Sequence, residues 1–536
     1  MKALFSLLCA LALALPAIAA PPRPKLIVAI SVDQFSADLF NEYRGQFSGG
    51  LKRLQEGVIF PAGYHAHAAT ETCPGHATLL TGDYPARTGI IANNWMDMSA
   101  GRADKRIYCA EDEAAAGSTS KNYSVSPIHL RVPTLGDRMK AANPQARIWS
   151  VAGKDRAAIM MGGHSADGIW WWNGKAFASF AGRETPELIG TINARTSAMI
   201  STGLPSPFLP LLCKARVQPV AITSERSVGI APPPLAAGDA DHFNIRAELD
   251  QATLDIAAGI VESQRLGRGP TTDLIAVGLS VTDYVGHSFG TEGPEMCNQL
   301  LALDQALGRF LDRLDRSGIA YAIMLSADHG GHDIPERNRS RAIVDDQRID
   351  AGLSLSALNA ALGHADKPAL AGDISGDLYL TAEVAQSERD KLLGDAKTWL
   401  QARPQVAAVF TDDELQGATR PSSPPELWTL RERAAASFAK GRSGDLVVLL
   451  KPRVTPIGDL SKPYIATHGS AWDYDRRVPI LFWWHGVQGF EQPNSVRTVD
   501  IMPTLAALIG LPLKPGEVDG QCLDLDSGGA STCANN

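Results

Sequence analysis

Short apolar runs that end in polar residues recur along the chain, and they constrain its fold more than any other feature. Residues 25–33, 273–280, 321–326 and 478–484 have this form, so we expect a buried β-strand in each of them. A helical repeat of apolar residues covers 294–316, between two of these runs. Alternating strands and helices predict an α/β fold in which a mostly parallel sheet is sandwiched by helices.

Two segments, at about 94–270 and 345–460, interrupt this alternation. The first contains Trp-rich and Pro-rich stretches at 170–172 and 232–234. The second carries its own helical and strand patterns. We interpret both segments as insertions within a single catalytic domain that spans residues 21–536, not as separate domains.

The first 20 residues have the layout of a secretory signal peptide. A short basic start is followed by an apolar stretch over 3–15 and by small residues at 17–20, before Pro21. The apolar stretch is short for a membrane span, although an uncleaved anchor is the alternative. No later segment has 18 uncharged apolar residues, so we expect a periplasmic or secreted protein with no stable membrane span.

The cysteines agree with export. Of the seven, Cys9 lies in the signal segment, and the other six form an even set that suits three disulfides. The simplest sequential pairing is Cys73–Cys109, Cys213–Cys297 and Cys522–Cys533, although six cysteines allow about fifteen pairings. The net charge of −8 and the lack of any Lys/Arg block argue against a nucleic-acid-binding module.

Acidic and histidine residues follow the predicted strands or lie in adjoining loops. Because the carboxyl ends of parallel strands meet at one edge of a sheet, we expect these side chains to gather there. Singly each signal is weak, since an aspartate after a strand is usually a helix cap. Three aspartates and three histidines together suit two zinc ions, each with an open position. The six candidates are Asp33, Asp283, His287, Asp328, His329 and His468.

Thr72 precedes Pro74 and is expected at the amino terminus of a helix. A phosphate bound there would meet free backbone N–H groups, and a metal could activate the threonine hydroxyl as a nucleophile. The alternative is that Thr72 only caps the helix. Lys154 and Arg156 occupy alternate positions of an extended segment, so both could face one anion, or both could lie in a solvated turn.

Seven motifs follow one another in order between residues 25 and about 511. They are Asp33-Gln, Thr72-x-x-Gly-His, Gly-Ile-x-x-Asn93-Asn, Gly-Lys154-Asp-Arg156, Thr-Asp283-Tyr-x-Gly-His287, Ser-x-Asp328-His329-Gly and Thr-His468-Gly. In these motifs the chain resembles the alkaline phosphatase superfamily, specifically its threonine-nucleophile branch of bacterial periplasmic phosphatases (the PafA type). The type I phosphodiesterase/nucleotide pyrophosphatase branch is a near relative.

The resemblance implies an alkaline-phosphatase-like core that hydrolyses small-molecule phosphate monoesters through a phosphothreonine at Thr72. It implies one zinc ion held by Asp283, His287 and His468. It implies a second zinc ion held by Asp33, Asp328 and His329, and also coordinating Thr72. The residues implied to contact the phosphate oxygens are Asn93, Lys154 and Arg156.

Three alternatives stay open at this point. A phosphodiesterase or nucleotide pyrophosphatase is the nearest, but that branch lacks the Lys–Arg pair. A sulfatase would need Cys-x-Pro-x-Arg where this chain has Thr72 and His76, and a silent zinc- or phosphate-binding protein would not need the full set of motifs. The histidines near Thr72, namely His65, His67 and His76, are expected in loops or behind the metal ligands, without binding metal themselves.

Overall fold

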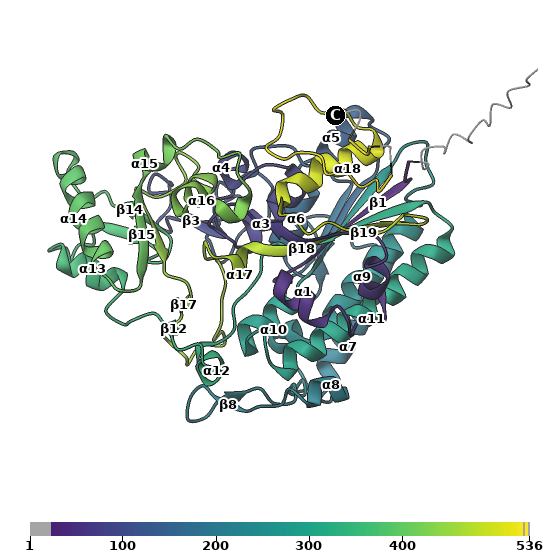
Figure 1. The fold of residues 1–536 in the computed structure, drawn as a ribbon, viewed down its shortest axis with the longest axis horizontal. Coiled ribbons are helices and arrows are strands. Elements are labelled where there is room, and N and C mark those ends of the chain that lie inside the picture. The colour runs from purple at the N-terminus through teal and green to yellow at the C-terminus, as the bar shows by residue number, and fades with distance from the viewer. Residues whose placement is uncertain (1–22, 529–530, 534–536) are drawn as a thin grey trace, which may run out of the picture.

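The computed structural model describes residues 23–528 and 531–533, so the predicted signal peptide lies outside the described residues. Within them, a ten-stranded sheet forms the centre of the molecule (Figure 1). Its order is β19 (Phe490–Glu491), β2 (Val58–Tyr64), β18 (Arg477–Trp484), β11 (Tyr321–Ser326), β1 (Leu26–Val32), β10 (Asp273–Leu279), β5 (Ile148–Ala152), β6 (Gly168–Trp172) and β7 (Phe177–Ala178), with β20 (Val496–Arg497) beside β2.

The middle of the sheet is parallel: β1 pairs with β10 and β11, β10 with β5, and β5 with β6. Only β18 breaks this direction near the centre, because it pairs antiparallel with both β11 and β2. The apolar run in β1 is buried throughout, as expected for a strand covered on both faces. The predicted α/β class with a mostly parallel sheet is confirmed.

Helices cover both faces of the sheet. Alternate residues of β1 contribute to two different hydrophobic cores, Val28 and Ile30 to one and Ile27 and Ala29 to the other. The first core includes apolar residues of α9 (Ala247–Ser263) and α11 (Pro294–Ser317), and the second includes those of α5 (Leu135–Ala142), α3 (Thr72–Thr81) and α18 (Ile501–Ile509). The predicted sandwich therefore follows from the alternation of side chains along each strand.

Part of the segment at 94–270 belongs to the central sheet and its core. Strands β5, β6 and β7 belong to the main sheet, and α9 packs on it. The Trp-rich stretch is strand β6 itself, whose five residues are all buried. Sequence periodicity missed these strands because they are short, and because Ser150 interrupts the apolar run of β5.

The segment at 345–460 builds a separate four-stranded sheet with its own hydrophobic core. Its strands are, in spatial order, β13 (Leu370–Gly372), β14 (Asp377–Leu380), β16 (Leu446–Leu450) and β15 (Val406–Thr411). Helices α13 (Leu355–Ala361) and α14 (Arg389–Gln401) contribute to the same core. Figure 1 shows this lobe beside the main sheet. The description of the chain as one domain with insertions stays a prediction.

The three disulfides are those of the simplest sequential pairing: Cys73–Cys109, Cys213–Cys297 and Cys522–Cys533. The second closes the longest loop, with a sequence separation of 84 residues, against 11 for the third. It ties α8 (Leu211–Lys214) to α11, the long helix on the main sheet.

Replacing Cys213 and Cys297 together by alanine should therefore destabilise the protein more than replacing Cys522 and Cys533 together. Loop-closure entropy predicts losses of about 4–5 and about 3 kcal/mol in the free energy of unfolding. Urea unfolding of both double variants measures the difference. A larger loss from the Cys522/Cys533 variant would show that loop length does not govern the contribution of these bridges.

Candidate active site

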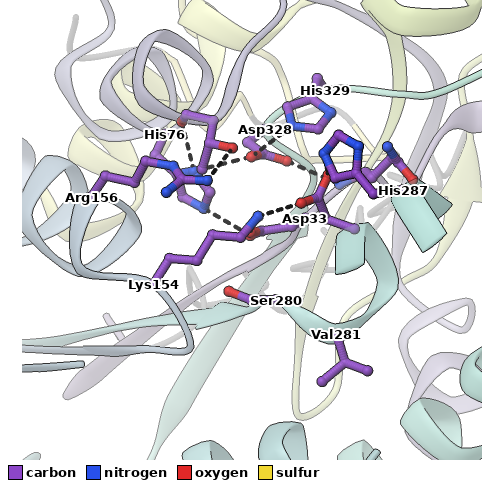
Figure 2. Close-up of polar contacts among 12 residues, drawn as sticks. Asp33, His76, Lys154, Arg156, Ser280, Val281, His287, Asp328 and His329 are labelled. Carbon is purple, nitrogen blue, oxygen red and sulfur yellow. Dashed lines mark hydrogen bonds and ion pairs between the residues drawn. The ribbon is translucent and has the colours of Figure 1, made fainter. Parts of the chain in front are cut away.

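Four adjacent strands deliver the predicted site residues to one edge of the sheet. Asp33 follows β1, Asp328 follows β11, and Lys154 lies two residues after the end of β5. Helix α10 (Val281–Phe289) begins two residues after the end of β10 and carries Asp283 in its first turn. The expectation that parallel strands would gather these residues is met, and Figure 2 shows Asp33, Lys154 and Asp328 around one centre.

Thr72 is the first residue of α3, and its side chain is buried. The helix lies close to the loop after β11: a Cβ on Gly75 would come within 2.0 Å of the Asp328 backbone oxygen. Only glycine permits this approach. It brings the amino terminus of α3 next to the loop that carries Asp328.

One cluster of possible metal ligands contains Asp33, Asp328 and His76. His76 Nε2 lies 3.2 Å from Asp33 Oδ1, and its Nδ1 lies 3.2 Å from Asp328 Oδ2. Burial acts to lower the pKa of His76, but Asp328 and Asp33 raise it to about 10. The His76 ring is thus in contact with both buried carboxylates.

A second cluster contains Asp283, His329 and His468. The Nε2 atoms of His287 and His468 each lie 3.3 Å from Asp283 Oδ1. The rings of His329 and His468 stack with their centroids 3.5 Å apart, and His329 Nε2 also lies 3.2 Å from Asp328 Oδ2. His329 therefore lies between the two groups of carboxylates.

The structure places His76, which was not among the predicted ligands, beside Asp33 and Asp328. His329 also lies next to Asp328, so its predicted assignment to that pair stays a prediction. His76 stands four residues after Thr72 and so lies on the same face of α3. The ring of His65 contacts Ala327 O and Thr498 Oγ1 and belongs to neither cluster.

Three histidines are held in the same orientation. The Nδ1 atoms of His287, His468 and His329 lie 2.7–2.8 Å from the backbone oxygens of Ala466, Thr70 and Gly330, respectively. A histidine that donates its Nδ1 proton to a carbonyl presents the lone pair of Nε2, which is how metal-binding histidines are usually oriented. Burial lowers the pKa of His287 to about 4, so that lone pair is available at neutral pH.

Several buried atoms at this centre make no hydrogen bond of normal geometry to the described residues, although they lie in ion pairs with one another or with Lys154. They are Asp33 Oδ1 and Oδ2, Asp283 Oδ1, Asp328 Oδ2, His76 Nε2 and His329 Nε2. Burial acts to raise the pKa of Asp283, but His287 and Lys154 hold it well below its usual value. Ionised, buried carboxylates surrounded by imidazoles form a donor set that fits divalent metal ions.

Lys154 lies between the two clusters. Its Nζ is 2.8 Å from Asp33 Oδ2 and 2.5 Å from Asp283 Oδ2, and its side chain is 1% exposed. In the structure its ammonium pairs with two buried aspartates, because β5 lies directly beside β10. That Lys154 could face a bound anion together with Arg156 stays a prediction.

Arg156 and Asn93 lie on the nucleophile side. Arg156 Nη2 is 3.5 Å from Thr72 Oγ1. Figure 2 shows the Arg156 guanidinium close to His76. Asn93 Oδ1 accepts from the Cys73 N–H at 2.8 Å, and the Asn93 N–H donates to Glu71 Oε2 at 2.8 Å. Because the side-chain oxygen of Asn93 already accepts a hydrogen bond, its NH₂ group is the part of the side chain that can donate to an anion at Thr72.

A cavity of about 490 Å³ opens next to these residues. Arg156, Asn93 and His468 line it from the side of the main sheet. Tyr379, in β14 of the four-stranded sheet, and Asp373, in the turn before β14, also line it. A ligand bound at Thr72 would therefore have room for a group that extends toward the second lobe.

The model of the family "Type I phosphodiesterase / nucleotide pyrophosphatase" matches residues 27–471. The chain is 51% identical to alkaline phosphatase PhoD of Zymomonas mobilis subsp. mobilis, over 95% of this chain and 89% of that one. It is 52% identical to alkaline phosphatase PhoK of a Sphingomonas species, over 96% and 94% of the two chains. The crystal structure of wild-type alkaline phosphatase PafA has the same fold, with a TM-score of 0.81 at 24% identity, over 94% of this chain and 99% of that one.

Asp283→Ala should lower the metal content of the purified protein, because the Asp283 carboxylate lies in contact with His287, His468 and Lys154 at the centre of the second cluster. It should also reduce the rise in melting temperature that zinc produces in chelator-treated protein. Elemental analysis and thermal unfolding with and without zinc measure both effects.

Asp273→Ala is the matched control, since Asp273 is a buried aspartate at the opposite end of β10 and pairs with Arg147. This control should lose stability but keep its metal. Equal metal content in the Asp283 variant and the wild type would contradict the assignment of the cluster.

Proposed function

Because the chain belongs to the type I phosphodiesterase/nucleotide pyrophosphatase family, we propose that it is an exported, two-zinc alkaline phosphatase that hydrolyses phosphate monoesters through a phosphothreonine at Thr72. The observation that carries this proposal is the half-buried Arg156 guanidinium, whose Nη2 lies 3.5 Å from Thr72 Oγ1. Two relatives more than half identical to the chain, PhoD and PhoK, are named alkaline phosphatases, which supports the same reaction.

The substrate preference follows from charge. A phosphate monoester dianion carries more charge on its terminal oxygens than a diester, in which one more oxygen is bonded to carbon. An arginine can bind two phosphoryl oxygens at once, and the Asn93 amide adds a neutral donor. Removing water from such a site strengthens these interactions, so cationic donors at Thr72 favour the monoester.

The chain's own residues perform the following steps. Thr72 Oγ1 attacks phosphorus from the amino terminus of α3, where the positive end of the helix dipole stabilises the phosphoryl group. The Thr72 hydroxyl gives up its proton as its oxygen bonds to phosphorus; the P–O bond to the leaving group breaks, and the leaving oxygen takes up a proton from solvent, which gives a phosphothreonine. Water then attacks this phosphorus and gives up a proton, the Thr72 O–P bond breaks, and the threonine oxygen is reprotonated as phosphate leaves. Arg156 and Asn93 hold the non-bridging oxygens throughout, together with Lys154 in the role that the family resemblance implies.

The donor sets proposed for the metals are those implied by the family resemblance. Asp283, His287 and His468 would hold one zinc ion, and Asp33, Asp328 and His329 would hold the other, next to Thr72. Bound zinc would supply the positive charge that lowers the pKa of the threonine hydroxyl and stabilises the leaving oxygen. The position of His329 between the two groups of carboxylates is compatible with either site.

Export is part of the proposal and follows from the amino-terminal pattern and the even set of cysteines in disulfides. Among the helices of the described residues, none has the length and apolar character needed to cross a membrane. The proposed substrates are small phosphate esters, for which the cavity beside Thr72 provides space.

Wild-type protein supplied with zinc should cleave an aryl phosphate monoester with a higher kcat/KM than an alkyl aryl diester with the same leaving group. Steady-state assays at alkaline pH measure both values. Thr72→Ala should remove turnover of both esters, because it removes the attacking oxygen. A higher kcat/KM for the diester would instead support the alternative function, a phosphodiesterase or nucleotide pyrophosphatase.

Arg156→Ala should lower kcat/KM for the monoester by roughly 10²-fold and should affect the diester less. The ratio of the two values is therefore the measurement of interest. Arg156 is preferred to Lys154 for this test, because loss of the Lys154 ammonium would leave two buried carboxylates without their counter-charge. An unchanged ratio would remove Arg156 from the account of substrate preference.

A further inference from the structure

Two tyrosines and an aspartate surround the base of the Arg156 side chain, and none of them was singled out by the sequence. Tyr108 Oη donates to Asp155 Oδ1 at 2.7 Å, and Tyr123 Oη donates to Asp155 Oδ2 at 2.7 Å. Asp155 Oδ1 also accepts from the Arg156 backbone N–H at 2.7 Å. Both oxygens of this carboxylate are therefore engaged.

The Tyr108 hydroxyl is in direct contact with the guanidinium, since Arg156 Nη1 lies 3.5 Å from its oxygen. A hydroxyl has one proton, and here that proton is donated to Asp155. The lone pairs of the oxygen are then left to accept from Arg156. Burial raises the pKa of Tyr108 well above its usual value, so the hydroxyl keeps this proton at alkaline pH.

These contacts fix which end of the guanidinium faces the nucleophile. With Nη1 beside Tyr108, Nη2 is directed to Thr72 Oγ1, also at 3.5 Å. A free arginine side chain has many rotamers. Because these contacts hold Arg156 in one orientation before substrate binds, the side chain does not have to be ordered during the reaction. The orientation of the guanidinium also determines where it can bind a phosphoryl oxygen.

We propose that Tyr108 is a specificity-determining positioning residue, which together with Tyr123 and Asp155 holds Arg156 in the orientation that selects phosphate monoesters. This inference rests on the proposed function. It adds three side chains to the account of substrate preference, acting through Arg156 and not on the substrate itself.

The disulfide Cys73–Cys109 connects this group to the nucleophile. Cys73 directly follows Thr72, and Cys109 directly follows Tyr108, so one covalent bridge joins the neighbours of both residues. The rings of Tyr108 and Tyr123 lie against each other with centroids 4.6 Å apart. The segment that carries the two tyrosines is thus attached to the start of α3 by a covalent bond as well as by hydrogen bonds.

The test is Tyr108→Phe, which removes one hydroxyl and keeps the ring. We expect kcat/KM for the monoester to fall roughly tenfold and kcat/KM for the matched diester to change less than about twofold, because misplacing a binding group lowers the rate steeply. Tyr123→Phe should have a smaller effect in the same direction, since its hydroxyl contacts Asp155 but not Arg156.

Tyr321→Phe is the matched control. Tyr321 Oη donates to Asp315 at 2.7 Å and accepts from Arg53 at 3.1 Å, so it belongs to the same kind of Tyr–Asp–Arg group. It stands at the start of β11, the end of the sheet opposite the site. This variant should keep the monoester-to-diester ratio of the wild type, whatever it does to the melting temperature.

The double variant Tyr108→Phe/Arg156→Ala separates positioning from a general structural role. If Tyr108 acts through Arg156, its substitution should cause no further loss once Arg156 is absent. An equal loss for both esters, or a tenfold further loss in the Arg156→Ala background, would overturn the inference. Wild-type protein that prefers the diester would instead overturn the proposed function, so the two failures are distinguishable.

Discussion

Asp33 and Asp283 follow two adjacent strands, and the Lys154 ammonium, carried by the strand beside them, lies between their carboxylates. All three side chains are removed from water, and each charge would be costly to bury alone. The position of one charge therefore depends on the other two, and through them on the register of β1, β10 and β5. His76 extends this balance of charge to Asp328. The geometry of the centre is thus set by strands that pair directly with one another.

Much of this arrangement could be predicted from the sequence, because it depends on local patterns. The apolar runs of β1, β10 and β11 are buried on both faces, and each is followed closely by its polar residues, so the order of residues gives the edge of the sheet where they meet. The number of disulfides was predictable for a different reason: six cysteines follow the predicted signal segment, and an even set suits complete pairing, of which the sequential arrangement is the one present in the described residues.

The other features of the site depend on tertiary packing, which local sequence patterns do not indicate. The sequence does not reveal that Gly75 lets α3 approach the Asp328 backbone, and this approach brings His76 between two aspartates. Short strands such as β6 carry too few residues for a period to be recognised, so their place in the sheet was missed. Tyr108 and Tyr123 lie far from any motif, and only the fold places both hydroxyls on Asp155.

The cavity near Thr72 is lined by residues of the main body and by residues of the segment that carries the four-stranded sheet. Arg156 and His468 belong to the side built on the main sheet, whereas Asp373 lies beside the four-stranded sheet with its own hydrophobic core. Substitutions in this segment can change the shape offered to a leaving group without disturbing the buried charges of the main body. Natural variation in the 345–460 segment could therefore diversify the esters accepted while the phosphoryl-transfer machinery is inherited intact.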